Sequence, residues 1–204
     1  VQLDDVVMVL RRLSNGQEVK LYGVVDMMVA RHEGARMETD VFLSSEGVLP
    51  LTHTVKAHVV VTRVEPEIFV PPLPGQPVYL AAGKDRENAL FFDGMTKRFP
   101  LGLARDGEPV WGNFEFLDGS RGAHVNISGI SGVATKTTYA TFLLYGIFQG
   151  GLLGAEASNT HALIFNVKGE DLLFLDKPNT SLKPEQAALY EKLGLTPGAF
   201  TDLA

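Results

Sequence analysis

Cysteine is absent from this sequence of 204 residues, which excludes a disulfide framework and any thiolate chemistry. A chain without cysteine fits a reducing compartment, so we expect a cytoplasmic protein. Basic residues are in the minority, with 18 Lys and Arg against 24 Asp and Glu, and the formal net charge is −6. This balance excludes a chain-wide basic field for nucleic acid. Any such contact must come from a local patch or from an assembly that concentrates basic loops.

Long apolar runs are missing as well. The longest candidate, residues 140–148, is interrupted by Thr141, Tyr145 and Gly146 and falls short of the ~18 residues of a membrane span. The opening residues, VQLDD, do not form a signal peptide, so we expect no association with a membrane. The chain starts without Met and directly in a strand-like run, so we expect it to begin inside a larger protein.

Residues 1–82 have the pattern of an all-β domain. Strand-like runs flank Asn15-Gly16, a strong hairpin signal, and two further runs flank a turn near Glu33-Gly34. Residues 52–66 alternate with a period of two, and five prolines within residues 66–77 then break regular structure. Short strands without a helical period between them predict a small antiparallel barrel or sandwich.

Residues 83–204 follow a different order, and we place a domain change between residues 82 and 83. A hairpin turning at Asp106-Gly107 precedes a predicted strand over 123–130 and a helix over 136–153, and residues 160–176 are predicted to form a second strand with a following turn. A short helix over 183–195 follows, with Pro184 in its first turn and Gly194 after its last. Strand, helix and strand in this order predict the first βαβ portion of a parallel sheet covered by helices.

The stretch HVNISGISGVATKTT, residues 124–138, joins the predicted strand to the helix. It approaches the phosphate-binding pattern G-x-x-x-x-G-K-[ST] with Gly129, Gly132, Lys136 and Thr137. It departs from the pattern because Thr135 stands where a glycine precedes the lysine, and because the loop counted from Gly129 is one residue too long. The alternative is an ordinary strand-to-helix turn with a surface lysine. Small residues throughout the turn favour phosphate, as does a lysine at a helix N-terminus, where an anion would neutralise it.

The same stretch resembles the start of the ATPase core of HerA-like proteins, in the HerA/FtsK superfamily of DNA translocases. Its phosphate loop has the form G-x-[ST]-G-x-G-K-[ST]. Gly129, Ser131 and Gly132 match the opening of this form and Lys136 and Thr137 match its end, whereas the residues between them depart from it.

The second predicted strand adds to the resemblance. In this family it often ends in D-x-[HK]-G-E, and here it reads NVKGED, so that Lys168, Gly169 and Glu170 match while Asn166 departs at the acidic position. The β-rich first 82 residues are similar to the small barrel, named for its likeness to one in rotary ATP synthases, that precedes the core. The resemblance therefore spans nearly the whole chain and implies a barrel followed by the beginning of a RecA-like P-loop domain.

The resemblance implies ATP and Mg²⁺ as ligands. The implied nucleotide-binding residues are Gly129, Ser131, Gly132, Val133, Ala134, Thr135, Lys136, Thr137 and Thr138. Lys136 would neutralise the β- and γ-phosphates, and Thr137 would bind Mg²⁺ through the nucleotide, with Thr138 as its substitute. Glu170 would lie near the nucleotide. The alternatives are a surface lysine, hydroxyls that cap the helix, glycines of a plain turn and a solvated glutamate.

The function that the resemblance implies is that of an N-terminal portion of an ATP-dependent DNA translocase or helicase. The full-length protein would form a homo-hexamer, act on double-stranded DNA in repair or end processing, and work with a NurA-type nuclease. The acidic pair and the arginine of a neighbouring subunit that hydrolysis requires have no match here, so this chain alone is not expected to hydrolyse ATP efficiently. The alternative is an interaction or oligomerisation module with a degenerate nucleotide site, for which Thr135 and Asn166 speak.

Other candidate residues have weaker patterns. Trp111, Phe114 and Phe116 have the residue type to stack on a nucleobase, but we expect them to form the core of the hairpin. The five histidines show no spacing of metal ligands. Asp176 ends an apolar run, but that run follows the preceding strand without a helix between them, so we do not assign it as the catalytic acid.

Overall fold

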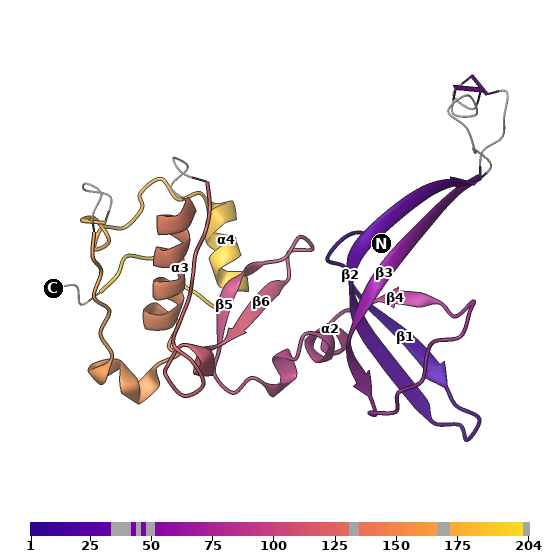
Figure 1. Ribbon diagram of the computed structural model, residues 1–204. Helices are drawn as coiled ribbons and strands as arrows, with labels where there is room; N and C mark the ends of the chain where they lie inside the picture. The colour runs from indigo at the N-terminus through magenta and orange to yellow at the C-terminus, as the bar shows by residue number, and fades with distance from the viewer. Residues whose placement is uncertain (34–41, 44–45, 48–51, 131–134, 167–171, 202–204) are drawn as a thin grey trace. The chain divides into compact units, whose positions relative to one another are not determined.

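A computed structural model describes residues 1–33, 42–43, 46–47, 52–130, 135–166 and 172–201 of the chain (Figure 1). The chain forms two compact units, Val1–Gly94 and Met95–Ala204, and each is described here by itself. The predicted mixture of helices and antiparallel β-sheets is confirmed. The domain change placed between residues 82 and 83 stays a prediction.

The first unit contains a four-stranded antiparallel sheet. Its strands are β1 (Val6–Arg12), β2 (Glu18–Glu33), β3 (Thr52–Glu65) and β4 (Val78–Leu80), in the order β3-β2-β1-β4. The hairpin predicted at Asn15-Gly16 is confirmed, since Leu13 N–H donates to the carbonyl of Gln17 across 2.8 Å and Gly16 has a φ of +83°. Glycine adopts this left-handed conformation without steric cost.

One face of this sheet carries a buried apolar cluster. Val19, Leu21 and Val64 form a buried cluster, and Leu13, Ile68 and Val70 pack against it. Successive side chains of a strand point to opposite faces, so alternate apolar residues of β2 reach this core together. The strand that was predicted after the turn near Glu33-Gly34 lies outside the described residues.

The sheet does not close into the expected barrel within the described residues. Strands β3 and β4 form its two edges, and β4 pairs only with β1, over three residues. Beyond Met27, β2 pairs with β3 alone, so the two strands continue as a ribbon rather than curving back toward β4. Closure requires hydrogen bonds between the edge strands, and these two edges make none with each other.

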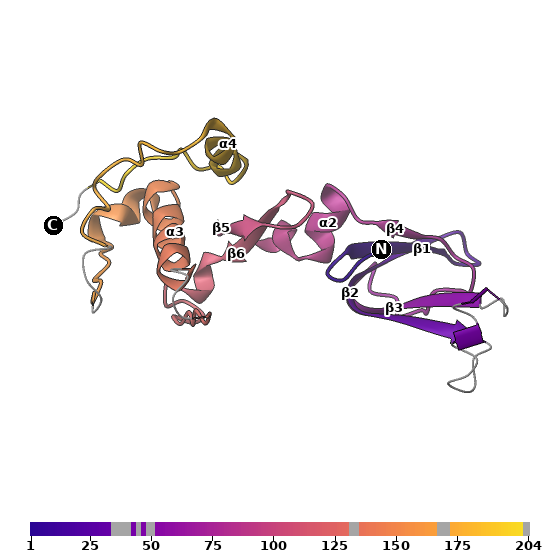
Figure 2. The same ribbon diagram turned by 90° about the horizontal axis from the view of Figure 1, so that it is seen from above.

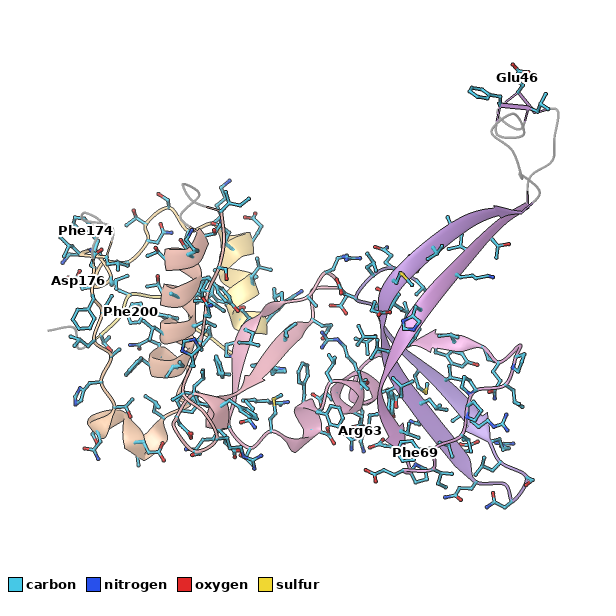
Figure 3. The ribbon with its side chains drawn as sticks, in the orientation of Figure 1. Glu46, Arg63, Phe69, Phe174, Asp176 and Phe200 are labelled. Carbon is cyan, nitrogen blue, oxygen red and sulfur yellow. The ribbon has the colours of Figure 1, made fainter. Side chains whose placement is uncertain are left out.

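Two short helices follow the sheet where the sequence indicated only a joint, namely α2 (Lys84–Ala89) and η1 (Phe92–Gly94). Polar side chains attach α2 to the sheet: Asp85 Oδ1 accepts from Lys20 Nζ across 2.7 Å and from the Tyr22 hydroxyl across 2.8 Å. The hydrogen bond from Lys20, and then that from Tyr22, lowers the pKa of Asp85. Arg63, labelled in Figure 3, likewise donates to both carboxylate oxygens of Asp93, across 2.7 and 2.9 Å.

The second unit begins with a β-hairpin of β5 (Arg98–Leu103) and β6 (Pro109–Asn113). The predicted turn at Asp106-Gly107 is confirmed, and Gly107 has a φ of +80°. The remaining elements are η2 (Phe114–Phe116), α3 (Thr135–Gln149), η3 (Gly154–Asn159) and α4 (Pro184–Lys192). The short helix with Pro184 in its first turn and Gly194 after its last is therefore confirmed.

Helix α3 is central to the second unit, as Figures 1 and 2 show. On one side Leu143 is buried with Phe99, Phe114 and Leu153, which joins the helix to the hairpin. On another side Tyr145 packs with Leu193 and Leu195, which follow α4. The apolar side chains of α3 therefore form part of the core of the second unit.

The two strands predicted on either side of α3 are not formed in the described residues. Residues 123–130 and 161–166 have no partner in a β-ladder, and residues 172–176 form a turn. Most of their large apolar side chains are open to solvent, with Ile130 82% exposed and Phe165 83% exposed, whereas Ile127 packs against the core cluster of the unit. A strand needs a neighbour for its backbone hydrogen bonds, and neither segment pairs with another strand in the described residues. The predicted parallel sheet is thus absent from this part of the chain.

None of the helices in the described residues is both long enough and apolar enough to span a membrane.

Candidate functional site

The first turn of α3 contains the candidate phosphate-binding residues that the structure describes. Thr135, Thr137 and Thr138 are exposed there, and Lys136 is half-buried between them. The middle of the loop, with Ser131, Gly132, Val133 and Ala134, lies outside the described residues, and so does Glu170. The site is therefore built here from its two ends, Gly129-Ile130 and the start of α3.

Lys136 joins these two ends. Its ammonium group donates to the carbonyl oxygens of Gly129, across 2.9 Å, and of Ile130, across 3.3 Å. The side chain therefore lies over the start of the loop, and its charge lies beside the carbonyl groups of Gly129 and Ile130. An ammonium group has three donors, and these two contacts use two of them.

Gly129 leaves the space that Lys136 occupies. A Cβ atom built on Gly129 would lie 3.3 Å from Cγ of Lys136 and 3.5 Å from Oγ1 of Thr135. Both distances approach or fall below ordinary van der Waals contact, so a side chain at residue 129 would crowd the lysine. The glycine is explained by this close approach.

The start of α3 is electropositive. Lys136 makes no ion pair with any carboxylate among the described residues, and the first turn of the helix contains no acidic residue. Free backbone N–H groups give a helix N-terminus a partial positive charge, which disfavours a lysine in the first turn. An anion bound beside Lys136 would neutralise both charges.

The helix that presents this site is fixed at three places. Tyr139 donates from its hydroxyl to the carbonyl of Leu101 on the hairpin, across 2.9 Å. One and a half turns later, Tyr145 donates to the carbonyl of Thr196, across 2.7 Å. Between them, Leu143 is buried in the core of the unit. The lysine therefore extends from a rigid element.

A cavity of about 520 Å³ adjoins the start of α3. The residues that line it come from the hairpin, from η2, from the segment before the loop and from α3; they include Leu101, Phe116, Val125, Ile127, Ser128 and Tyr139. Ser128 immediately precedes Gly129, so the cavity reaches the edge of the candidate site. No sequence pattern predicted this cavity, because its walls come from four separate elements.

The path of the chain around the site is visible in Figure 1. Residues 123–130 run alongside α3 toward its N-terminus, the helix runs in the opposite direction, and residues 160–166 return in the direction of the first segment. Ile127 packs against the core cluster that contains Leu143, so the first segment contacts the helix directly. The three segments follow the order of a strand–helix–strand crossover without the hydrogen bonds of a sheet.

Phe116 was expected in the core of the hairpin, but it is 54% exposed and lines the cavity beside Ser128. The other candidates from the sequence make contacts of their own. Phe114 is buried and packs edge-on against Phe99 with ring centroids 6.1 Å apart, which explains it as core. Trp111 lies under the guanidinium of Arg98 at 5.2 Å. Asp176 belongs to a turn and pairs with Lys177 across 2.7 Å. Among the described residues, no group of three or more His, Asp or Glu is placed to hold a metal ion.

Comparison with known proteins adds no relative. No protein-family model matches this chain, and a search of curated proteins finds no match. The HerA-like resemblance therefore rests on the motif residues alone.

Proposed function

We propose that this chain is the N-terminal portion of a HerA-like ATP-dependent DNA translocase or helicase, and that residues 129–138 bind the phosphates of Mg-ATP. One observation carries the proposal. The ammonium group of Lys136 lies against the carbonyl groups of Gly129 and Ile130, at the start of the loop, and has no carboxylate partner among the described residues. A cation, a helix N-terminus and a glycine closely approached by the side chain of the cation are together the parts of a phosphate cradle.

Each residue has a definite role under this proposal. Lys136 exchanges its carbonyl partners for the β- and γ-phosphate oxygens, and the backbone around Gly129 approaches the phosphates closely. Thr137 supplies the hydroxyl for Mg²⁺, with Thr138 one position along the same exposed turn. Glu170 would lie near the nucleotide. ATP supplies the phosphoryl group whose transfer to water drives a motor of this class.

The wider assembly follows from the same resemblance. The second unit would belong to a RecA-like P-loop domain, and the first unit would be its barrel-like N-terminal domain. The exposed apolar segments on both sides of α3 support this, because strands of such a sheet are covered on both faces and rich in apolar residues. The full-length protein would be a hexamer that moves double-stranded DNA in repair or end processing, with a NurA-type nuclease as its partner.

Calorimetric titration with Mg-ATPγS tests the nucleotide site. The chain is expected to bind, and Lys136→Ala is expected to abolish the binding. Lys183→Ala is the matched control, because Lys183 is an exposed lysine at the N-terminus of α4. Equal binding by the wild type and Lys136→Ala would refute the assignment of the loop.

A second candidate function has a specific observation in its favour. Two of the three ammonium donors of Lys136 are already satisfied by backbone carbonyls, as expected for a lysine with a purely structural role. The chain would then be an interaction or oligomerisation module with a degenerate nucleotide site. This candidate predicts no Mg-ATPγS binding by the wild type and a lower thermal stability of Lys136→Ala.

A further inference from the structure

The connection between β3 and β4, residues 66–77, exposes apolar side chains in the first unit. Phe69, labelled in Figure 3, is 85% exposed, and Leu73 is 51% exposed. Pro71, Pro72 and Pro74 are exposed as well. Nothing in the nucleotide proposal uses this segment.

The backbone of this segment is restricted to one conformation. Val70, Pro71 and Leu73 each precede a proline, which excludes the helical region for them and leaves extended or polyproline II geometry. The proline rings fix φ near −65° at residues 71, 72 and 74. The turn that follows is closed by Gln76 N–H donating to the Leu73 carbonyl, and Gly75 has a φ of +82°. These are the features of a type II turn, whose first central residue has nearly polyproline II angles.

Both ends of the segment are attached to the sheet. Ile68 and Val70 pack against the buried cluster of Val19, Leu21 and Val64. At the other end, Gln76 donates from Nε2 to the carbonyl of Leu10 across 3.1 Å, and its Oε1 accepts from Leu73 N–H across 2.6 Å. A segment fixed at both ends loses little conformational entropy when a partner binds it.

We propose that residues 70–74, VPPLP, are a preformed polyproline II ligand for a partner protein with an aromatic-lined groove. Phe69 lies directly before them, in a tight turn in which Val70 N–H donates to the Ile68 carbonyl across 2.9 Å. A polyproline II helix has three residues per turn, so Pro71 and Pro74 lie on one face, as in P-x-x-P ligands. Phe69 adds an exposed aromatic side chain of the kind that anchors protein interfaces. Exposed Glu67 lies next to the segment and gives it an acidic flank, so the groove should have Lys or Arg at its rim.

The experiment titrates the whole chain with purified, isolated domains that have such grooves, one SH3 domain and one WW domain, by calorimetry. At least one domain should bind weakly, with a dissociation constant on the order of 10 µM. Phe69→Ala and the double substitution Pro71→Ala/Pro74→Ala should each weaken this binding at least about tenfold. Pro178→Ala, at an exposed proline of the second unit, should leave it unchanged.

Two outcomes would overturn the proposal. One is the absence of binding to both domains, or binding that the substitutions at residues 69, 71 and 74 do not change. The other is a wild-type chain that self-associates in sedimentation while Phe69→Ala stays monomeric, because a second copy would then cover the segment. Phe69 makes little contact with the core, so an unchanged thermal midpoint of Phe69→Ala keeps the test free of misfolding. The nucleotide titration is independent of each of these outcomes.

Discussion

The ammonium nitrogen of Lys136 lies 2.9 Å from the carbonyl oxygen of Gly129, seven residues earlier in the chain. This contact places a positive charge at the start of the loop, where a neutral carbonyl group accepts its hydrogen bond. A phosphate oxygen is a stronger acceptor for an ammonium group than a carbonyl is, because the bond joins two opposite charges. If a phosphate oxygen replaced a carbonyl oxygen as the acceptor, the ammonium group would keep its hydrogen bond and gain an opposite charge beside it.

Gly129→Ala should weaken Mg-ATPγS binding several-fold while leaving the fold intact. The added Cβ would lie 3.3 Å from Lys136 Cγ, so the lysine side chain must shift from its position. Gly129 does not have a positive φ, which means that alanine fits the backbone. Gly94→Ala is the control, since nothing lies within 4 Å of a Cβ there. Calorimetry of the two variants measures the effect, and equal affinities would argue against a role of Lys136 in binding.

Thr137→Ala should remove the Mg²⁺ dependence of nucleotide binding, whereas Thr138→Ala should retain it. The hydroxyl directly after the lysine is the one that reaches the metal in a phosphate loop of normal length. Titration of each variant with ATPγS, with and without Mg²⁺, measures the dependence. The opposite result, with Thr138 required and Thr137 dispensable, would mean that the longer loop shifts the register by one residue.

The candidate site could be predicted from the sequence only in part. The spacing of Gly129 and Lys136 indicated a loop before a helix, and the helix does begin at Thr135. The backbone carbonyl partners of Lys136 could not be predicted, because they depend on how the loop folds back. The cavity beside Ser128 was missed for a similar reason, since residues far apart in the sequence form its walls.

In the fold, too, features that depend on neighbouring residues could be predicted, whereas features that depend on residues far apart in the sequence could not. Hairpins at Asn15-Gly16 and Asp106-Gly107 follow from turn residues and neighbouring strands, and both were predicted correctly. Residues 123–130 have the composition of a strand, but pairing depends on a neighbouring strand that the described residues do not supply. Helix α2 was missed because its attachment depends on Asp85 meeting Lys20, 65 residues earlier.

Asp85→Asn should destabilise the first unit by about 1–2 kcal/mol at neutral pH, since it removes a charge-assisted hydrogen bond that is partly open to water. The pKa of Asp85 is lowered by Lys20 and Tyr22, so the stabilisation is complete above the ordinary carboxyl value of 3.8 and is lost as the pH falls through the lowered value. Urea denaturation followed by NMR signals of β2 should therefore show a difference between wild type and variant that shrinks in acid.

The control for these urea denaturations at different pH values is Asp118→Asn. Asp118 also has a lowered pKa, through the backbone N–H of Ser120, but it belongs to the second unit. Its substitution should leave the urea midpoint of β2 unchanged at every pH. A difference for Asp85→Asn that does not depend on pH would mean that the carboxylate charge contributes nothing and that only its shape matters.

Tyr145→Phe should destabilise the second unit by about 1 kcal/mol, because it removes the hydrogen bond that the hydroxyl of the buried Tyr145 donates to the carbonyl of Thr196. Tyr139→Phe removes a similar bond to Leu101 from a side chain that is 38% exposed, where water replaces the hydroxyl, so it should cost less than about 0.5 kcal/mol. Trp111, the single tryptophan of the chain, reports the unfolding of this unit in urea by its fluorescence.

The pH dependence of the stability of Tyr145→Phe and Tyr139→Phe shows whether burial of the Tyr145 hydroxyl matters. Burial raises the pKa of Tyr145 above its ordinary value of 10.0. The hydroxyl therefore contributes fully below pH 10.0, and its contribution falls as the pH rises toward the raised pKa. The stability difference between wild type and Tyr145→Phe should shrink in that alkaline range, while Tyr139→Phe stays close to wild type. If both variants lost the same free energy of unfolding at neutral pH, the hydrogen bond of Tyr145 would stabilise α3 no more than that of Tyr139 does.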